Sequence, residues 1–566
     1  MRRARPERGA RTPHDGGPIV WPAAGLVAAL AFLALLLAAP PASNDVWAVN
    51  AFRSLDFGPR FALLLLATGA ACLPFVPRRR GLAAALGVAA AIVIAFALRE
   101  RVHFLGDTQI RQRAMSAFSV NLVQVSIAEW STRMHANPLD ILVDFLAPIA
   151  LLRMGASLAD AVSVVSFLLA LAFFAGVWRV SGRLGAPPEL RLALAAALAL
   201  AGSLETFAGY AESGGLLLVA AAWWWAEMLA PLTGRGQALR TALAWLALFM
   251  AHRIGVIMLL PLAWRALGPP LAGDAPEGRR WLAGAGAAAA AIAAATLLIG
   301  VGGRQLGMDA HDLLPSLGTM AKAVPPSDLI NILLLVMPFA LLAPWLAGRD
   351  PVAAFARSAE GRLVLVAAAP LVPLIWIVPS GANALGAHRD WDLGTFAGLT
   401  LTIAASLLVA RLPAPRLRGA LIVALPVAAL VAGGWVTVNA DNDAMTPRIR
   451  ALALDPPGLI APQQSHLHMY MGQRAMDLGA PEFAAPEFDR AFALNPNPRR
   501  ALLAAEAWAR AGRVVSARAS LARARAAGPL SPSLEDGAKK VATLIDRVAA
   551  DSVAADSARA AGAPRR

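Results

Sequence analysis

Charged residues and cysteine are both scarce in this chain. Asp, Glu, Lys and Arg make up only 15% of its 566 residues, whereas 58% are hydrophobic and the mean hydropathy is +0.58. A soluble protein of this size carries more charge, so the composition indicates a polytopic membrane protein. The one cysteine, Cys72, excludes an intramolecular disulfide, and its place inside an apolar run is typical of a small buried residue.

The motifs of several enzyme classes are also absent. The sequence contains no zinc-ligand spacing, no nucleotide-binding phosphate loop, no dinucleotide fingerprint and no Ser-His-Asp signature. The absence of a nucleotide loop is compatible with a donor substrate carried by a lipid.

Apolar runs dominate what is present. Runs of about 17–25 residues cross a hydrocarbon core as helices, so the pattern predicts an all-α, polytopic membrane helical bundle of about 11–13 spans. The predicted spans lie at Pro18–Ala39, Phe61–Val76, Leu82–Leu98, Leu158–Trp178, Leu192–Leu204, Leu216–Leu229, Ala242–Leu262, Trp281–Ile299, Leu329–Leu346, Leu363–Val378, Phe396–Val409 and Ala420–Val438.

The net charge of +15 is explained by topology rather than by a nucleic-acid partner. If the basic tail 1–17 is cytoplasmic, the arginine clusters between spans are cytoplasmic too, as the positive-inside rule requires. We therefore predict a multi-pass plasma (inner) membrane protein with an uncleaved first span, since its apolar run is longer than that of a signal peptide. The clusters are Arg78–Arg80, Arg179–Arg183, Arg235–Arg240, Arg279–Arg280, Arg349–Arg362 and Arg411–Arg418.

Two segments interrupt the simple pattern of spans. His252 and Arg253 divide Ala242–Leu262, which predicts either two short half-spans meeting at a polar tip or one long tilted helix with a snorkelling arginine. Within the predicted outer loop 99–157, the stretch beginning at Asn137 is broken by Asp144 and Pro148. We predict that it forms a helix along the outer membrane interface.

The chain changes character after Val438. A predicted linker, 439–465, precedes an Ala/Arg-rich region, 466–550, in which a small-large-small-Pro pattern recurs at a spacing of 33 residues (484 to 517). This spacing resembles tetratricopeptide repeats and predicts a small α-solenoid on the outer side, with 530–550 as a capping helix and 551–566 as a disordered tail. The matching residues are Gly479, Ala484, Phe488, Ala491 and Pro496, then Gly512, Ala517, Leu521, Ala524 and Pro529.

The residues able to carry out chemistry fall in the predicted outer loops, which suggests a site assembled at one membrane face. Asp107, in the first large loop, can act as a general base or position a metal, although it is also a good N-cap for a helix beginning near Thr108. Asp309, His311 and Asp312 form a second acidic loop, which either joins Asp107 in a divalent-cation site or only adds solubility.

Three further groups are candidates for substrate binding. Glu205, Tyr210 and Glu212 can hydrogen-bond sugar hydroxyls, although an interfacial Tyr is also an ordinary membrane anchor. Arg253, beside His252, suits a lipid phosphate, with a structural ion pair to Glu205 or Glu212 as the alternative. The densest cluster surrounds Trp391, and there an arginine can bind phosphate while the indole stacks on a sugar. Its polar members are His388, Arg389, Asp390 and Asp392, and Arg111 completes the predicted phosphate-binding set.

The layout resembles the GT-C superfamily of polytopic membrane glycosyltransferases. The resemblance rests on Asp107 in the first outer loop, on Asn137-Pro138-Leu139-Asp140 before the interfacial helix, and on Ser157-Leu158-Ala159-Asp160 opening a span. It covers roughly residues 99–438 by architecture, and a C-terminal repeat extension is similar to some protein O-mannosyltransferase-like members.

The resemblance implies a sugar moved from a polyprenyl-phosphate carrier to an acceptor on the extracytoplasmic face. Asp107 would deprotonate the acceptor hydroxyl, and the repeats would dock a protein or glycan acceptor. Many family members carry a paired acidic motif in the first loop, whereas this chain has a single Asp there, which leaves a divalent cofactor open. The alternatives are a transporter or flippase, and a non-catalytic membrane assembly protein that presents the repeats.

Overall fold

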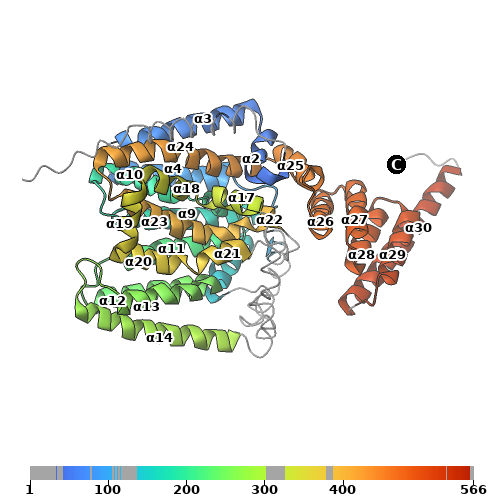
Figure 1. Ribbon diagram of the computed structural model, residues 1–566. Helices are drawn as coiled ribbons and strands as arrows, with labels where there is room; N and C mark the ends of the chain where they lie inside the picture. Colours follow the sequence, from blue (N-terminus) through green and yellow to red (C-terminus); the bar gives the residue numbers. More distant parts are fainter. Residues whose placement is uncertain are drawn as a thin grey trace, which may run out of the picture.

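The computed structural model describes residues 43–76, 80–104, 137–300, 326–377, 386–530 and 532–560, together with the single residues 34, 108, 111, 112 and 115. Every regular element in these ranges is a helix, which confirms the predicted all-α class (Figure 1). Four helices are long and apolar enough to cross a membrane, and a bent pair raises the number to as many as five. The four are Phe57–Phe75, Leu158–Ser181, Pro276–Leu298 and Ala414–Asn439.

Each predicted span inside the described ranges corresponds to one helix or to a pair of helices, while Pro18–Ala39 lies outside them apart from residue 34. Several of these helices are too short to cross a bilayer alone, so the count of about 11–13 crossings stays a prediction. The span at 363–378 is divided into α20 (Ala359–Ala368) and α21 (Leu371–Ile377). The spans that form a single helix are α3 (Phe57–Cys72), α4 (Arg80–Ile92), α9 (Leu158–Ser181), α10 (Arg191–Ala199), α11 (Gly214–Met228), α14 (Pro276–Gly300), α23 (Thr395–Val409) and α24 (Ala414–Asn439).

The span predicted at 242–262 is a broken, returning pair and not one tilted helix. Extended backbone at His252 (φ −157°, ψ 136°) ends the first helix, and the His252 ring accepts a hydrogen bond from the amide of Ile254 at 3.1 Å. The far ends of the two arms meet the same neighbour, because Arg240 bonds Glu227 and Arg265 bonds the carbonyl of Met228. The pair consists of α12 (Arg235–Ala251), η9 (Arg253–Met258) and α13 (Leu259–Leu267).

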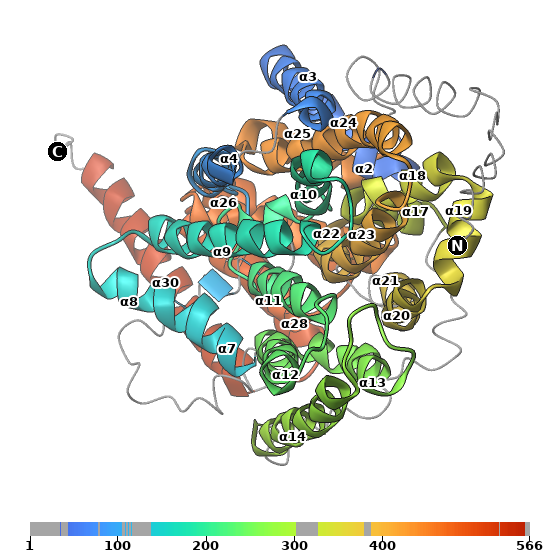
Figure 2. The ribbon, with the colours of Figure 1, turned by 90° about the vertical axis from the view of Figure 1, so that its left-hand side faces the viewer.

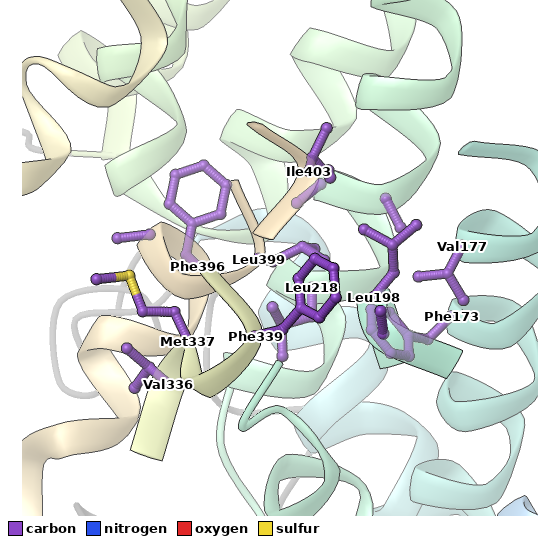
Figure 3. Close-up of a cluster of buried hydrophobic side chains, with 14 of the residues drawn as sticks. Phe173, Val177, Leu198, Leu218, Val336, Met337, Phe339, Phe396, Leu399 and Ile403 are labelled. Atoms are coloured by element: carbon purple, nitrogen blue, oxygen red, sulfur yellow. The ribbon is translucent and has the colours of Figure 1, made fainter. Parts of the chain in front are cut away.

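The span predicted at Leu329–Leu346 is a bent pair of helices, either one broken span or a re-entrant loop, because the chain turns by 88° in its middle. The bend separates α17 (Pro326–Val336) from α18 (Pro338–Ala347) at Met337, whose backbone (φ −150°, ψ 48°) is not helical. Pro338 lacks an amide hydrogen and forces the preceding residue out of the helical region, which explains the break. Figure 3 shows Met337 packed in the apolar core near Phe396 of α23.

This bend depends on a close approach by α23. A Cβ atom added at Gly398 would clash with the carbonyl oxygen of Val336, which is backbone and cannot move aside. We expect Gly398→Ala to lower the stability of the detergent-solubilised protein by about 1–3 kcal/mol, the usual cost of overpacking. Gly419→Ala in α24 is the matched control, because nothing lies near its Cβ and alanine favours a helix. Equal melting temperatures for the two variants would contradict the expectation.

Ion pairs gather at one end of the bundle, which we call the arginine end. Glu227, near the end of α11, accepts hydrogen bonds from Arg179 of α9 at 2.6 Å and from Gln237 of α12 at 2.7 Å. Arg265 of α13 is fully buried and pairs with Asp274. A buried arginine requires such partners, so these bonds fix the ends of neighbouring helices to one another.

The opposite end carries acidic and aromatic side chains, and we call it the polar end. Because α9 has 24 residues and is about 36 Å long, Asp160 in its first turn and Arg179 in its last turn lie at opposite ends of the bundle. Arg99 bonds Asp160 at 2.8 Å, and the amide of Glu100 bonds the carbonyl of Ala208 at 2.5 Å. The start of the first predicted outer loop and the loop before α11 therefore meet here. Which end faces the cytoplasm stays a prediction.

The predicted interfacial helix forms a continuous helical stretch at the rim of the bundle. In Figure 2 it lies beside α9 and α12, which it contacts. Asn137, just before it, donates a hydrogen bond to the carbonyl of Phe249 at 2.5 Å, close to the tip of the α12–α13 pair. The stretch consists of α7 (Pro138–Asp140), the π-helix η6 (Ile141–Leu146) and α8 (Ala147–Arg153).

The C-terminal helices, which we call the array, extend from the polar end (Figure 1). Positions related by the 33-residue spacing (484 to 517) occupy equivalent sites, since Gly479 and Gly512 both form turns with positive φ (+72° and +74°). The matching apolar residues are all buried: Ala484, Phe488 and Ala491, then Ala517, Leu521 and Ala524. The array consists of α26 (Ala461–Asp477), α27 (Pro481–Leu494), α28 (Pro498–Arg510), α29 (Val514–Ala526) and α30 (Pro532–Ala560).

Two domain boundaries differ from the prediction. The predicted linker 439–465 contains α25 (Asn442–Leu454), which packs on α24 and buries Met445 and Ile449. Proline and aspartate in this stretch suggested a loop, but Asp441 instead caps α25 by accepting a hydrogen bond from the amide of Asp443. The last helix, α30, continues to Ala560 and so includes part of the predicted disordered tail.

Candidate functional site

The candidate site residues divide into those that the structure describes and those that it does not. Asp107, Asp309, His311 and Asp312 lie outside the described residues, and so does the side chain of Asp390. The proposed roles of these groups stay predictions. All the other candidates lie at the polar end.

Tyr210 is the centre of the described cluster. It belongs to the loop between η8 (Leu204–Phe207) and α11, and its hydroxyl lies 2.9 Å from Oε2 of Glu212 and 2.6 Å from Oδ2 of Asp392. Asp392 comes from η10 (Trp391–Gly394), directly after α22 (Ala387–Asp390), so the contact joins segments far apart in sequence. Burial, reinforced by Asp392 and Glu212, raises the pKa of Tyr210 well above its usual value. The phenol therefore keeps its proton.

Arg111 forms a buried, two-pronged ion pair beside this cluster. Its guanidinium lies 3.0 Å and 3.2 Å from the two carboxylate oxygens of Asp140. Burial and the neighbouring Asp140 carboxyl raise the pKa of Asp144 well above its usual range, which favours its neutral form. The charge of Glu212 acts on both Arg111 and Asp144, which places the ion pair close to the Tyr210 cluster.

His252 and Arg253 stand at the tip of the α12–α13 pair. The charges of Asp140 and Arg111 both act on His252. The Arg253 side chain is exposed, and within the described ranges it makes no ion pair or hydrogen bond. The structural alternative, a pair with Glu205 or Glu212, is therefore wrong for the described residues.

His388 and Arg389 belong to α22, shortly before Asp392, and both contact Phe104. The Arg389 guanidinium lies 5.2 Å from the ring centre of Phe104 and 5.4 Å from that of Tyr470, and its Nε donates to the carbonyl of Phe104 at 2.9 Å. His388 stacks on Phe104. Burial, with the positive charges of Arg389 and Arg448, lowers the pKa of His388 to about 3, so this ring is neutral at neutral pH.

Glu205 belongs to η8, just before the loop that carries Tyr210. It is buried beside Glu100 and the amide of Asn439, the last residue of α24. Burial and the charge of Glu100 raise the pKa of Glu205 well above its usual range. A buried carboxyl whose neutral form is favoured in this way suits a structural role at the end of α24.

Several contributing residues were not among the sequence candidates. Asp140 and Asp144 are four residues apart, so a helix places both carboxyls on one face, and this spacing was a usable signal. Glu100 and Phe104, in contrast, look like ordinary residues at the end of a span. Tyr470 lies in the array, and no sequence pattern connects it to residue 104.

The cluster contains no evident metal site. In the described part of the chain, no three His, Cys, Asp or Glu side chains are placed to hold a metal ion. No family model, curated protein or solved structure matches this chain. The polar end thus combines an ion pair, a tyrosine bridged to two carboxylates, an exposed arginine and neutral histidines at one end of an apolar helical bundle.

Proposed function

We propose that the protein is a membrane glycosyltransferase that moves a sugar from a polyprenyl-phosphate carrier to an acceptor at the extracytoplasmic face. The observation that carries this proposal is the cluster at the polar end, where Tyr210, Glu212 and Asp392 lie beside the Arg111–Asp140 pair. Such a cluster offers several hydrogen-bond acceptors for the hydroxyl groups of a sugar. Its position at the end of a lipid-facing bundle suits a donor whose carrier is a lipid.

Each arginine receives a distinct role in this proposal. Arg253 is exposed and makes no ion pair in the described ranges, so its guanidinium is assigned to the carrier phosphate. Arg111 is engaged by Asp140, and Arg389 is held against Phe104 and Tyr470. These two arginines are assigned to building the site. Asp107 keeps the role of base for the acceptor hydroxyl.

A donor panel tests this function directly. Purified protein in nanodiscs is incubated with a series of labelled polyprenyl-phosphate sugars, and release of sugar from the lipid is measured. We expect one donor class to be consumed, with the carrier phosphate as the second product. Consumption of none, under conditions in which the protein stays folded, would favour the assembly-protein alternative. Movement of an intact donor across the bilayer would favour the flippase.

Arg253→Met isolates phosphate binding. We expect it to raise KM for the lipid donor by about tenfold or more, because one charge-assisted contact contributes about 1.5–3 kcal/mol. Arg183→Met is the control, since this arginine is also exposed but lies at the arginine end. An equal rise in KM for both variants would show a general surface-charge effect and contradict the assignment.

A further inference from the structure

A short segment, residues 101–104, connects the span formed by α4 and η4 (Val93–Ala97) to the loop that carries Asp107. Its backbone is strained at His103, where φ is +54°. Residues other than glycine rarely adopt this left-handed conformation, because Cβ then crowds the following carbonyl oxygen. Such a conformation persists only when the surroundings hold it in place.

Residues of the helical bundle form hydrogen bonds with the chain just before and just after His103. The amide of Phe104 donates to Oε1 of Glu100 at 3.0 Å, and the carbonyl of Phe104 accepts from Nε of Arg389 at 2.9 Å. The amide of Arg101 donates to the carbonyl of Asn439 at 3.2 Å. These bonds fix Arg101 and Phe104, the two ends of the segment, but none of them involves Val102 or His103.

The first helix of the array supplies the missing contacts. The buried hydroxyl of Tyr470 donates to the carbonyl of Val102, and Arg474, one turn further along α26, donates to the carbonyl of Arg101 at 2.6 Å. The Tyr470 ring also packs edge-on against Phe104, with ring centres 5.2 Å apart. Two consecutive carbonyls just before His103 thus receive their hydrogen bonds from the array.

Charges of the array also act on His103. Burial and the positive charge of Arg474 lower the pKa of His103 to about 4, against the opposing charge of Asp477 in the same helix. The ring is therefore neutral at neutral pH, and its Nδ1 lies 3.3 Å from the amide nitrogen of Gln112, beyond Asp107 in the chain. The strained residue consequently touches the chain on both sides of Asp107.

We propose that α26 is a positioning element of the site, in which Tyr470 and Arg474 hold residues 101–104 in their strained conformation beside Glu100 and Arg389. The array is then part of the site and not only a docking appendage, so an acceptor that displaces α26 releases residues 101–104. The expected effect on sugar transfer rests on the proposed function, whereas the effect on the segment itself does not.

Hydrogen exchange measured by mass spectrometry tests the positioning without any substrate. In the full-length protein we expect Tyr470→Phe, which keeps the ring and removes the donor, to increase amide exchange in the peptide covering 99–104 about fivefold, the factor for one net hydrogen bond. Arg518→Met in α29 is the control, because Arg518 bonds Asp546 within the array and does not contact the segment. Unchanged exchange in Tyr470→Phe would overturn the proposal.

A second substitution shows whether strain at His103 is what Tyr470 restrains. Glycine adopts positive φ without steric cost, so adding His103→Gly to Tyr470→Phe should return the exchange of the segment toward the wild-type rate. A structural defect elsewhere in the array would not be rescued in this way. Exchange in the double variant as fast as in Tyr470→Phe alone would show that the strain is held by other contacts and overturn this part of the proposal.

Transfer assays then separate the two proposals. We expect Tyr470→Phe to lower kcat with little change in KM for the lipid donor, because the donor phosphate is assigned to Arg253, and His103→Gly should restore part of that loss. A protein that transfers no sugar from any donor but shows the expected exchange pattern refutes the glycosyltransferase and retains the positioning role. The opposite result refutes the positioning role alone.

Discussion

Asp107→Asn is expected to lower the rate of sugar transfer by about 10²–10⁴-fold, the usual contribution of a general base. An amide has nearly the shape of the carboxylate but cannot accept the proton of the acceptor hydroxyl. Phe104, three residues before Asp107 in the sequence, is bonded to Glu100 and Arg389 at the polar end.

The same experiment distinguishes the base from a metal ligand. Asp309→Asn is the matched control, because Asp309 belongs to the acidic loop that would bind a divalent cation together with Asp107. We expect Asp309→Asn to retain transfer within a few fold, and added chelator to have no effect on either protein. A comparable loss in both variants, reversed in the wild type by added divalent cation, would replace the base by a shared metal site.

Much of the bundle could be predicted from apolar periodicity, and its breaks show where that signal ends. The interruption at His252 was visible because two polar residues stand inside an apolar run. Hydropathy does not reveal the 88° bend at Met337, because the run Leu329–Leu346 stays apolar throughout and only Pro338 marks the break. Hydropathy measures which residues avoid water, whereas proline acts on backbone geometry, so the two signals must be read separately.

The candidate site was only partly predictable for a related reason. Tyr210 and Asp392 could be selected because each is a polar residue next to a span, and the structure joins them directly. Their bridging arrangement depends on how α11 and α23 pack, which no local pattern contains. The contribution of Tyr470 is harder still to foresee, since a buried tyrosine in a helical array has many ordinary explanations. Contacts between segments that are distant in the sequence can be identified only once the fold is known.

Tyr210→Phe is expected to have the second largest effect, a loss of transfer of about 100-fold. The substitution removes the hydroxyl that lies within hydrogen-bond distance of both Glu212 and Asp392. Bonds to charged groups contribute about 1.5–3 kcal/mol each, and leaving such groups without a donor costs at least as much. The two carboxyls would then separate or take up water, and the acceptors offered to the sugar would lose their geometry.

The contacts of the Tyr210 hydroxyl with Glu212 and Asp392 also predict the protonation of these two carboxyls. A phenol has one hydrogen, so if Tyr210 donates to one carboxylate, its oxygen can bond the other only when that carboxyl is protonated. Infrared difference spectra at neutral pH should therefore show a protonated-carboxyl band that disappears in Glu212→Gln and equally in Asp392→Asn. Loss in only one variant would assign the proton permanently to that residue, and loss in neither would contradict a bridging phenol.

The raised pKa of Tyr210 gives a final check, with a definite sign. Because folding favours the protonated phenol, Tyr210 stabilises the native state fully below about pH 10, the usual tyrosine pKa, and this contribution declines as the pH rises further. Tyr210→Phe should remove part of that alkaline decline. The only other tyrosine, Tyr470, also has a raised pKa, so Tyr470→Phe must be measured in parallel. An unchanged alkaline profile in both variants would mean that neither phenol ionises before the protein unfolds for other reasons.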